Sequence, residues 1–453
     1  MIYDTERGDF AMALAGDVMV TRRLSPFREK RYLALRDILC GADAAFANLE
    51  GPVRSDGDGA PGLVHGTWMT MPPMAAEELQ WLGITLASCA NNHIFDYGEG
   101  GLLATLRHLD GGGIVHAGAG RTLAAARRPA YLDTARGRVA LVAITATFDP
   151  WTAAGAQSRD TGGRPGVNPL AHRVTCTVDD EGFAELHRIA GALGFAKAGE
   201  RDRKHSRRSG DKTAANGDAL LFLGRRFVRG KDFAIATEAD ADDVEDNLRS
   251  IREARRTADW VVLSLHSHEF GGRSALTAAR RTDLVEPADF TAAFARAAVD
   301  AGADVVVGHG SHVPLGIELY KGRPILHSVG NLIFQTETIP AFPTAAYNRH
   351  GLGPAATPSD FHDARTDGGR RGLPASPEFW ENIVVRCAFR KGKLAELRIH
   401  PVDQGYGRSR AQRGRPVLAN GTVAARVLAR MQRLCRRYKV TVNIQGSVGI
   451  VRP

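Results

Sequence analysis

Residues 87–120 read ASCANNHIFDYGEGGLLATLRHLDGGGIVHAGAG, with a polar cluster between an apolar run and an amphipathic one. The apolar run that ends at Ala90 predicts a buried β-strand. After the cluster, Gly100 to Leu109 places leucines on one helical face, and the glycines that start at Gly111 predict the end of that helix. Two asparagines, a histidine and an aspartate therefore lie at a turn from strand to helix.

Four other apolar runs predict strands that end in polar residues, at residues 10–15, 42–51, 260–265 and 304–307. Their polar residues are Asp17, Asn48, Glu50, His266, His309 and His312. Helical segments at about 243–257 and 288–301 precede the last two runs, which predicts parallel βαβ units. Ligands of open α/β sheets bind at the carboxyl ends of strands, so one shared polar site is favoured over unrelated caps and turns.

The residues at these strand ends offer oxygen and nitrogen donors without a thiolate. Such a mixture suits divalent manganese, iron or zinc, with calcium as a further candidate, and two ions about 3.5–4 Å apart could share it. Each residue taken alone has a plainer explanation, since an aspartate after Gly16 is often a turn residue and a single buried histidine is often a hydrogen-bonded core residue. The six candidate ligands are Asp17, Glu50, Asn92, His266, His309 and His312.

The composition describes an ordinary globular chain of 453 residues, with 43% hydrophobic and 24% charged residues. Lys and Arg total 59 against 50 Asp and Glu, so an anionic substrate or polymer is a reasonable partner, although a surface mixture rich in arginine explains the excess equally well. The five cysteines form no C-x-x-C pair, which favours a reducing compartment. Without a signal peptide or a long apolar run, the sequence predicts a cytoplasmic protein with no integral membrane segment. No nucleic-acid partner is predicted, and the oligomeric state stays open.

One catalytic domain is predicted over residues 8–405, with a C-terminal helix and strand at 406–453 packed on it. Two segments, at about 196–230 and 341–375, look like insertions, and we expect solvated loops or partly ordered lids there. The first contains the basic run Arg201–Arg208, whose positive charge would attract an acidic substrate unless the run is simply a solvated loop. The alternating pattern of ENIVVRCAFRKGKLAELRIHPV predicts a β-hairpin whose turn is the KGK sequence.

Six motifs occur in order over about 320 residues of the chain: GDVM, ANLEGP, CANNHIFDYGEGGLLATLRHLDGGGIVHAGAG, LHSHEF, GADVVVGHGSHV and YKGRPILHSVGNLIF. This set resembles the CapA family of poly-γ-glutamate capsule-synthesis proteins. That family is similar to the calcineurin-like metallophosphoesterases. The resemblance implies an α/β protein with a four-layer α/β/β/α sandwich, in which two sheets are flanked by helices.

The resemblance also implies roles for individual residues. Asp17 would bind the first metal ion and Asn92 the second, and His266, His309 and His312 would surround the pair. His93 would be the acid/base histidine beside the asparagine ligand. Asp96 would orient His93, although it could instead only cap the following helix.

The chain departs from the superfamily pattern at three places. Met19 stands where a histidine is usual, and the NLE sequence leaves Glu50, with Asn48 as the second choice, in place of a bridging aspartate. His268 replaces the glycine of a His-Trp-Gly motif, so His268 and the adjacent Glu269 become further acid/base candidates. Substrate contacts are expected from three polar residues near the strand ends, Asn48, Ser328 and Asn331.

These features favour a metal-dependent enzyme that hydrolyses a peptide-like or poly-γ-glutamate-type substrate rich in carboxylates. The partner would be a peptide or an anionic polymer. The same site would also serve a peptide Cα epimerase, because several acid/base groups surround it. Phosphomonoester hydrolysis and a non-catalytic polymer-binding scaffold are the remaining alternatives, and the sequence does not choose among them.

Overall fold

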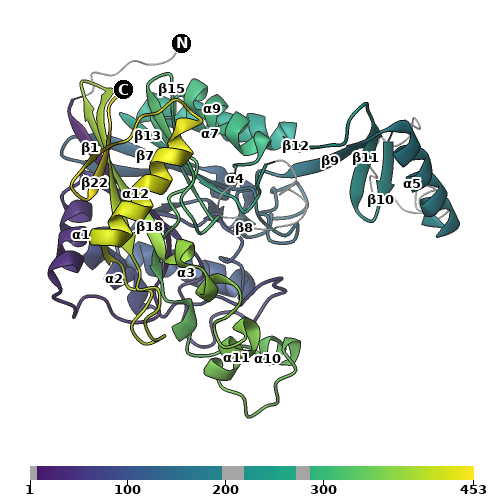
Figure 1. Cartoon of the computed structure of the whole chain (residues 1–453), viewed down its shortest axis with the longest axis horizontal. Helices are drawn as coiled ribbons and strands as arrows, with labels where there is room; N and C mark the ends of the chain where they lie inside the picture. Colours follow the sequence, from purple (N-terminus) through teal and green to yellow (C-terminus); the bar gives the residue numbers. More distant parts are fainter. Residues whose placement is uncertain (1–7, 196–218, 272–285) are drawn as a thin grey trace. The chain divides into compact units, whose positions relative to one another are not determined.

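The computed structural model describes residues 8–195, 219–271 and 286–453. Its contacts divide the chain into two units (Figure 1). The first unit comprises residues 1–170, 242–268 and 294–453, and the second comprises residues 171–241 and 269–293. The predicted domain bounds, 8–405 and 406–453, stay a prediction.

The larger sheet of the first unit is mixed and has ten strands. Its central strand pairs in parallel with two neighbours, and an antiparallel hairpin pairs with the same strand and extends the sheet on one side. Its main path runs in the order β21 (Asn443–Gln445), β22 (Val448–Val451), β19 (Lys393–Asp403), β18 (Glu381–Arg390), β1 (Phe10–Met19), β2 (Ala44–Leu49), β3 (Leu86–Ser88) and β4 (Val115–Ala117). In addition, β17 (Asn331–Phe334) pairs with β1 and β20 (Val417–Leu418) pairs with β19.

A second sheet of the first unit has six strands, and its inner four are parallel. It runs in the order β15 (Ile317–Tyr320), β16 (Arg323–Leu326), β14 (Val305–His309), β13 (Trp260–His266), β7 (Gly137–Thr145) and β6 (Ala130–Thr134). A short two-stranded sheet pairs β5 (Ala119–Gly120) with β8 (Gly166–Val167). The parallel arrangement predicted for the strands that end at His266 and His309 is confirmed.

The helices that the structure describes join or follow these strands. They are α1 (Lys30–Cys40), α2 (Met74–Leu82), α3 (Gly98–Gly111), α4 (Leu123–Arg127), α5 (Asp180–Ala192), α7 (Ala241–Thr257), α9 (Asp289–Ala301), α10 (Thr344–Arg349), α11 (Pro358–Thr366) and α12 (Gly421–Arg436). The described residues also include the short 3₁₀ turns η2 (Thr336–Thr338), η3 (Leu373–Ala375) and η4 (Pro377–Trp380). Among the described helices, none combines the length and the apolar character needed to cross a bilayer.

Two apolar clusters lie on opposite faces of the ten-stranded sheet. Alternate residues of β1 point to opposite faces, so Met12 joins the cluster shared with the six-stranded sheet while Ala13 joins the cluster shared with α1, α2 and α3. The C-terminal helix α12 also belongs to the first cluster and contacts β18 and β19, which Figure 1 shows beside it. The predicted α/β class is confirmed, whereas the four-layer sandwich stays a prediction.

Strand β1 continues further than the sequence predicts. We expected Gly16 to break it before Asp17, but β1 continues to Met19 with a bulge between Asp17 and Val18. Parallel pairing on both sides, to Asn48 and to Asn331, keeps the residue in the sheet. Gly16 is required because a Cβ atom there would lie 1.7 Å from the Gly330 carbonyl oxygen. Asp17 is therefore held by the sheet, not by a turn.

The second unit contains a four-stranded sheet. Its order is β10 (Ala219–Phe222), β11 (Arg225–Arg229), β9 (His172–Val178) and β12 (Ala234–Ala239). The prediction of a loop over 196–230 is wrong for the part that β10 and β11 occupy. The basic run Arg201–Arg208 lies outside the described residues.

The prediction of a loop over 341–375 is also wrong, because α10 and α11 form there. The side chain of Thr357 accepts a hydrogen bond from the backbone N–H of Asp360, whose carboxylate bonds back to Thr357, so a capping box starts α11. Aromatic packing holds the segment, since the rings of Phe342 and Phe361 have centroids 4.3 Å apart. The hairpin predicted for residues 381–402 is confirmed as β18 and β19.

Candidate metal centre

The carboxyl ends of strands from both sheets bring six buried polar residues together. Pairing between β13 and β14 places His266 opposite His309, and pairing between β1 and β2 places Asp17 opposite Asn48. Glu50 follows β2 directly, and His312 lies three residues after the end of β14. All six are buried: Asp17, Asn48, Glu50, His266, His309 and His312.

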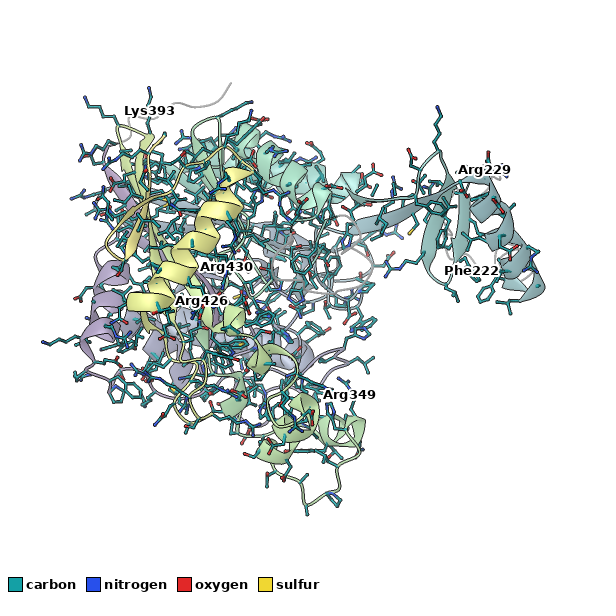
Figure 2. The ribbon with its side chains drawn as sticks, in the orientation of Figure 1. Phe222, Arg229, Arg349, Lys393, Arg426 and Arg430 are labelled. Carbon is teal, nitrogen blue, oxygen red and sulfur yellow. The ribbon has the colours of Figure 1, made fainter. Side chains whose placement is uncertain are left out.

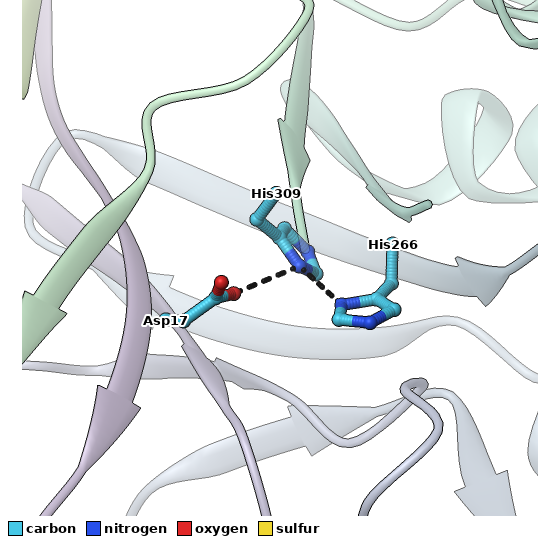
Figure 3. Close-up of side chains that lie close together, drawn as sticks. All are labelled: Asp17, His266 and His309. Carbon is cyan, nitrogen blue, oxygen red and sulfur yellow. Dashed lines mark hydrogen bonds and ion pairs between the residues drawn. The ribbon is translucent and has the colours of Figure 1, made fainter. Parts of the chain in front are cut away.

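One group of three donors consists of Asp17, His266 and His309, whose ligand atoms all lie within 4.8 Å of one another. Figure 3 shows His309 between the other two side chains. Its Nδ1 lies 3.5 Å from Asp17 Oδ1 and 3.0 Å from His266 Nδ1. One carboxylate oxygen and two imidazole nitrogens so close together form a set that could hold a divalent ion.

A second group of three donors consists of Glu50, His268 and His312, again within 4.8 Å of one another. Each carboxylate also faces a histidine of the other group. His312 Nδ1 lies 3.3 Å from Asp17 Oδ2, and His266 Nδ1 lies 3.5 Å from Glu50 Oε2. The two groups are therefore in direct contact through their carboxylates.

The surroundings of two of these residues favour the protonation state that binds a metal ion. Burial raises the pKa of Asp17, but hydrogen bonds and attraction from His309 and His312 outweigh it and hold the pKa well below its usual value. Burial, with a smaller effect from the neighbouring His309, holds the pKa of His266 well below its usual value. An ionised carboxylate and a neutral imidazole both present lone pairs to a cation.

Gly310 allows the loop after β14 to pass close to the donors. Its φ of 97° suits glycine, and a Cβ atom there would lie 2.8 Å from Cε1 of His266. The Gly310 N–H also donates to Asp17 Oδ2 at 3.2 Å. A side chain at this position would displace His266, so the glycine is needed for the spacing of His309 and His312.

Further side chains hold the donors in place. The Asn48 amide donates to Asp17 Oδ1 at 2.8 Å and to Glu50 Oε2 at 2.5 Å, so it orients both carboxylates. Ser264 Oγ lies 2.7 Å from His309 Nε2, and Asn331 Oδ1 lies 2.9 Å from His312 Nδ1. Such partners fix the ring orientation of metal-binding histidines.

Two of the predicted substrate-binding residues are buried within this network. Asn331 begins β17, and its amide contacts His312 and the Phe379 carbonyl. Ser328 Oγ pairs with Ser311 Oγ at 2.8 Å. Their role in substrate binding, like that of Asn48, stays a prediction, and the structure shows that all three contact other protein groups.

The stretch after β3 adds a histidine–aspartate pair to the site. Asn92 Oδ1 lies 2.9 Å from His266 Nε2, and the next residue, His93, places Nδ1 2.8 Å from Asp96 Oδ2. Asp96 is not a helix cap, because Tyr97 occupies the N-cap position of α3 and the Asp96 carboxylate accepts the Met69 N–H at 2.6 Å. The predicted hydrogen bond is present, while the acid/base role of His93 stays a prediction.

Asp96 itself has an unusual environment. Burial raises its pKa, and the attraction of His93 and the Met69 hydrogen bond oppose this rise only in part. The carboxylate is thus held close to His93 in a site with little water.

The two remaining acid/base candidates differ in position. The His268 ring centroid lies 5.1 Å from that of His266 and 5.6 Å from that of His312, and the backbone N–H of His268 donates to Thr147 Oγ1. His268 therefore joins the cluster. Glu269 belongs to the second unit.

Sequence reasoning missed the part played by Asn91. Its amide donates to the Leu49 carbonyl at 2.7 Å and to Asn48 Oδ1, and its oxygen accepts the N–H groups of His93 and Ile94. Asn91 thereby ties the turn of His93 to the strand of Asn48. The asparagine doublet was the only sequence signal for it.

Comparison with known proteins gives the family. Residues 11–336 match the model of the family described as "Bacterial capsule synthesis protein PGA_cap". The chain belongs to this family. The CapA-type motifs that predicted it are confirmed.

Relatives with related names cover different shares of the chain. "Uncharacterized protein y4sH" of Sinorhizobium fredii is 33% identical over 98% of this chain and 93% of its own length. "Probable polyglutamine synthesis accessory protein Rv0574c" of Mycobacterium tuberculosis is 26% identical over 66% of this chain and 57% of its own length. "PGA biosynthesis protein CapA" of Bacillus subtilis is 34% identical over 33% and 38%, respectively. The names of the family and of two of these relatives refer to capsule, PGA or polyglutamine synthesis.

Proposed function

We propose that this protein is a metal-dependent enzyme that hydrolyses a peptide-like, carboxylate-rich substrate of the poly-γ-glutamate type. The observation that carries the proposal is the pairing of two three-donor groups, buried except for the half-buried His268, with a histidine–aspartate pair on the adjacent turn. The name of one relative, a PGA biosynthesis protein, supports the substrate class. Membership of the family supports a role in capsule or polyglutamate synthesis.

The donor chemistry fits divalent cations. Asp17, His266 and His309 would hold one ion, and Glu50, His268 and His312 a second. Four imidazoles among six donors favour manganese, iron or zinc, whereas calcium prefers oxygen ligands and fits least well. Bound ions would supply positive charge that polarises a substrate carbonyl and increases the acidity of a water molecule.

The protein groups would orient and protonate the substrate. Asp96 binds Nδ1 of His93, which fixes the tautomer and leaves Nε2 for the substrate. His93 is 7% exposed, so this nitrogen would act where little water competes. Hydrolysis of an amide needs a proton on the departing nitrogen, and His93 would supply it. Asn92 holds His266 on the other side of the same turn.

A peptide Cα epimerase is the second candidate. Its support is His268, which adds an acid/base group within 5.1 Å, measured between ring centroids, of His266. Removal of an α-proton and its return from the opposite face require two such groups, and His93 and His268 would provide them.

The fold and the compartment complete the proposal. The two apolar clusters on opposite faces of the ten-stranded sheet support the four-layer sandwich. All five cysteines are free, and four of them are buried, which supports a reducing compartment such as the cytoplasm.

One experiment separates the candidates. Purified protein loaded with manganese or zinc is incubated with a γ-linked glutamate oligomer in water enriched in ¹⁸O, and in parallel in D₂O, and the products are examined by mass spectrometry. Hydrolysis gives shorter oligomers with one ¹⁸O in the new carboxylate, and epimerisation adds one deuterium without cleavage. Cleavage of an aryl phosphate alone would replace the proposal by a phosphomonoesterase, and binding of the oligomer without any turnover would replace it by a scaffold.

A further inference from the structure

A cavity of about 210 Å³ lies beside the histidine–aspartate pair, on the segment that contains α10 and α11. One wall is the loop of residues 65–68, and the other comes from the two helices. The lining residues that matter here are Gly66, Trp68, Arg349, His350, Phe361 and Arg365. This segment follows the end of the family match at residue 336.

Two contacts connect the cavity to the candidate acid/base pair. Gly66 lines the cavity, and a Cβ atom on it would lie 3.9 Å from Cε1 of His93. Three residues later, the Met69 N–H donates to Asp96. A substrate chain with its reacting amide at His93 would therefore place its neighbouring units beside this cavity.

Arg349 fixes the shape of the cavity. Its guanidinium donates to the carbonyls of Val64 at 2.7 Å and Gly66 at 2.6 Å, and it lies 4.8 Å from the ring centroid of Trp68. Figure 2 shows Arg349 on the segment of α10 and α11. These contacts join the two walls of the cavity. Because they engage the N–H groups of Arg349, a ligand would be bound by other residues of the cavity.

Arg365 and His350 are the neighbours with binding capacity. Within the part of the chain that the structure describes, neither side chain makes a hydrogen bond or an ion pair, and the His350 ring contacts only the edge of Phe361, with centroids 5.3 Å apart. Burial and the positive charges of Arg365 and Arg349 lower the pKa of His350. Glu337 acts on Arg365 from a distance, but this carboxylate is already bound by Arg413 and Arg410.

The cavity thus has an excess of positive charge and a planar donor group without a partner. We propose that it binds a carboxylate of the substrate chain, with Arg365 as the main contact and His350 as the second, while the reacting amide lies at His93. A guanidinium binds a carboxylate through two parallel hydrogen bonds, and Arg365 has these donors without a protein partner among the described residues. The inference deepens the proposed function and rests on it, because it assigns the acidic group that the enzyme recognises.

The test measures binding without turnover. Metal-loaded protein with His93→Ala is titrated with a γ-linked glutamate pentamer and with the same pentamer in which every α-carboxylate is an amide, and the Kd values are obtained by calorimetry. Arg365→Gln in this background should weaken binding of the acid pentamer by about 10–100-fold, the range for a hydrogen-bonded charged group. The amidated pentamer should bind both proteins equally.

A matched control separates a specific contact from general attraction. Arg371→Gln removes one positive charge from the same segment, at a side chain that is 80% exposed and lies 3.9 Å from Asp367. Its Kd for the acid pentamer should stay within about twofold of the parent. Equal weakening by the two variants, or none by Arg365→Gln, overturns the inference.

A local readout keeps this inference distinguishable from the proposed function. Phenylglyoxal modifies exposed arginines, and mass spectrometry reports the rate at Arg365. The acid pentamer should slow this modification and leave that of Arg371 unchanged, even if no hydrolysis is ever detected. Protection by inorganic phosphate at the same concentration, but not by the pentamer, overturns the carboxylate assignment in favour of a phosphate site. Turnover of the pentamer without any protection overturns the inference and leaves the proposed function intact.

Discussion

The donor groups and the cavity of α10 and α11 are built in different ways. Asp17, His266 and His309 are 0–1% exposed and are positioned by strand pairing, so their spacing follows from backbone register. Arg349 and Arg365 project from two short helices, of which α11 begins at a capping box and is held by aromatic packing. Under the proposed function, the sheet fixes the reactive groups, and the later segment would change substrate preference without moving the donors.

The two regions also differ in the charge that they leave uncompensated. Buried carboxylates and imidazoles are costly unless they are paired, and here they pair within the first donor group and between the two groups. The cavity instead carries unpaired positive charge near solvent, where the cost is low. Cations should therefore stabilise the first region and anions the second.

The largest expected effect tests the sheet-based region. Asp17→Ala removes a carboxylate that contacts His309 and His312, so both donor groups lose a partner. We expect the metal content to fall and turnover to disappear, a larger loss than the roughly 10²–10⁴-fold expected for a proton-transfer residue. Elemental analysis and turnover of the γ-linked oligomer measure the two effects.

The control for Asp17→Ala is Asp133→Ala. Asp133 lies on strand β6, is 72% exposed and pairs with Arg138 of β7, so its loss should leave the metal content and turnover unchanged. Full metal occupancy in Asp17→Ala would remove Asp17 from the site.

The second prediction concerns His93, which lies between the two regions. His93→Ala should keep the fold and most of the metal, because the ring is outside both donor groups, yet lower turnover by roughly 10²–10⁴-fold. His116→Ala is the matched control, since His116 also forms a histidine–aspartate pair, with Asp110 at 3.0 Å, but lies outside the donor groups. Near wild-type turnover in His93→Ala, or loss of its metal, would contradict the assigned role.

The sequence predicted the first region far better than the second. Polar residues after apolar runs located the donors because strand ends in parallel sheets meet at one edge. The same logic failed for Asp17, where pairing on both sides kept the residue within β1 despite Gly16. The sheet order also depends on pairing between distant strands, such as β1 with β18, which no local pattern encodes.

The sequence did not predict the cavity, because several contacts that form it are made by backbone groups and leave no pattern of side chains. The Met69 group that binds Asp96 is a backbone N–H, and the carbonyls that hold Arg349 are also backbone groups. A capping box at Thr357–Asp360 was present in the sequence and would have indicated α11. The position of α11 relative to His93, however, depends on tertiary packing, which the capping box does not encode.

The third prediction tests how the cavity segment is anchored. His362 is buried on α11, and burial together with the charges of Arg410 and Arg365 lowers its pKa to about 4. A histidine in the unfolded chain titrates near 6.5, so the unfolded state binds more protons between about pH 6.5 and 4 and stability falls as the pH drops through that range. The shift corresponds to about 3 kcal/mol when complete.

His362→Gln should reduce this dependence on pH. Urea unfolding at pH 7.5 and at pH 4.5 gives the change in the free energy of unfolding, which should be smaller in the variant than in the wild type. His65→Gln, at a side chain that is 83% exposed, is the matched control and should retain the wild-type difference. An equal difference in all three proteins would show that His362 does not set the acid stability of this segment.

The smallest expected effect concerns Asn331. It tests whether this residue orients the metal donor His312 or contacts the substrate. The sequence predicted substrate binding, whereas the structure shows its amide oxygen 2.9 Å from His312 Nδ1 with the residue 0% exposed. If Asn331 orients His312, Asn331→Ala should lower the affinity for metal by about 10–100-fold, the usual effect of losing such a partner, and KM measured at saturating metal should stay constant. If Asn331 binds substrate instead, KM should rise and metal affinity should not change. Ser328→Ala is the control, because Ser328 pairs with Ser311 and not with a donor, so metal titration should give the wild-type affinity.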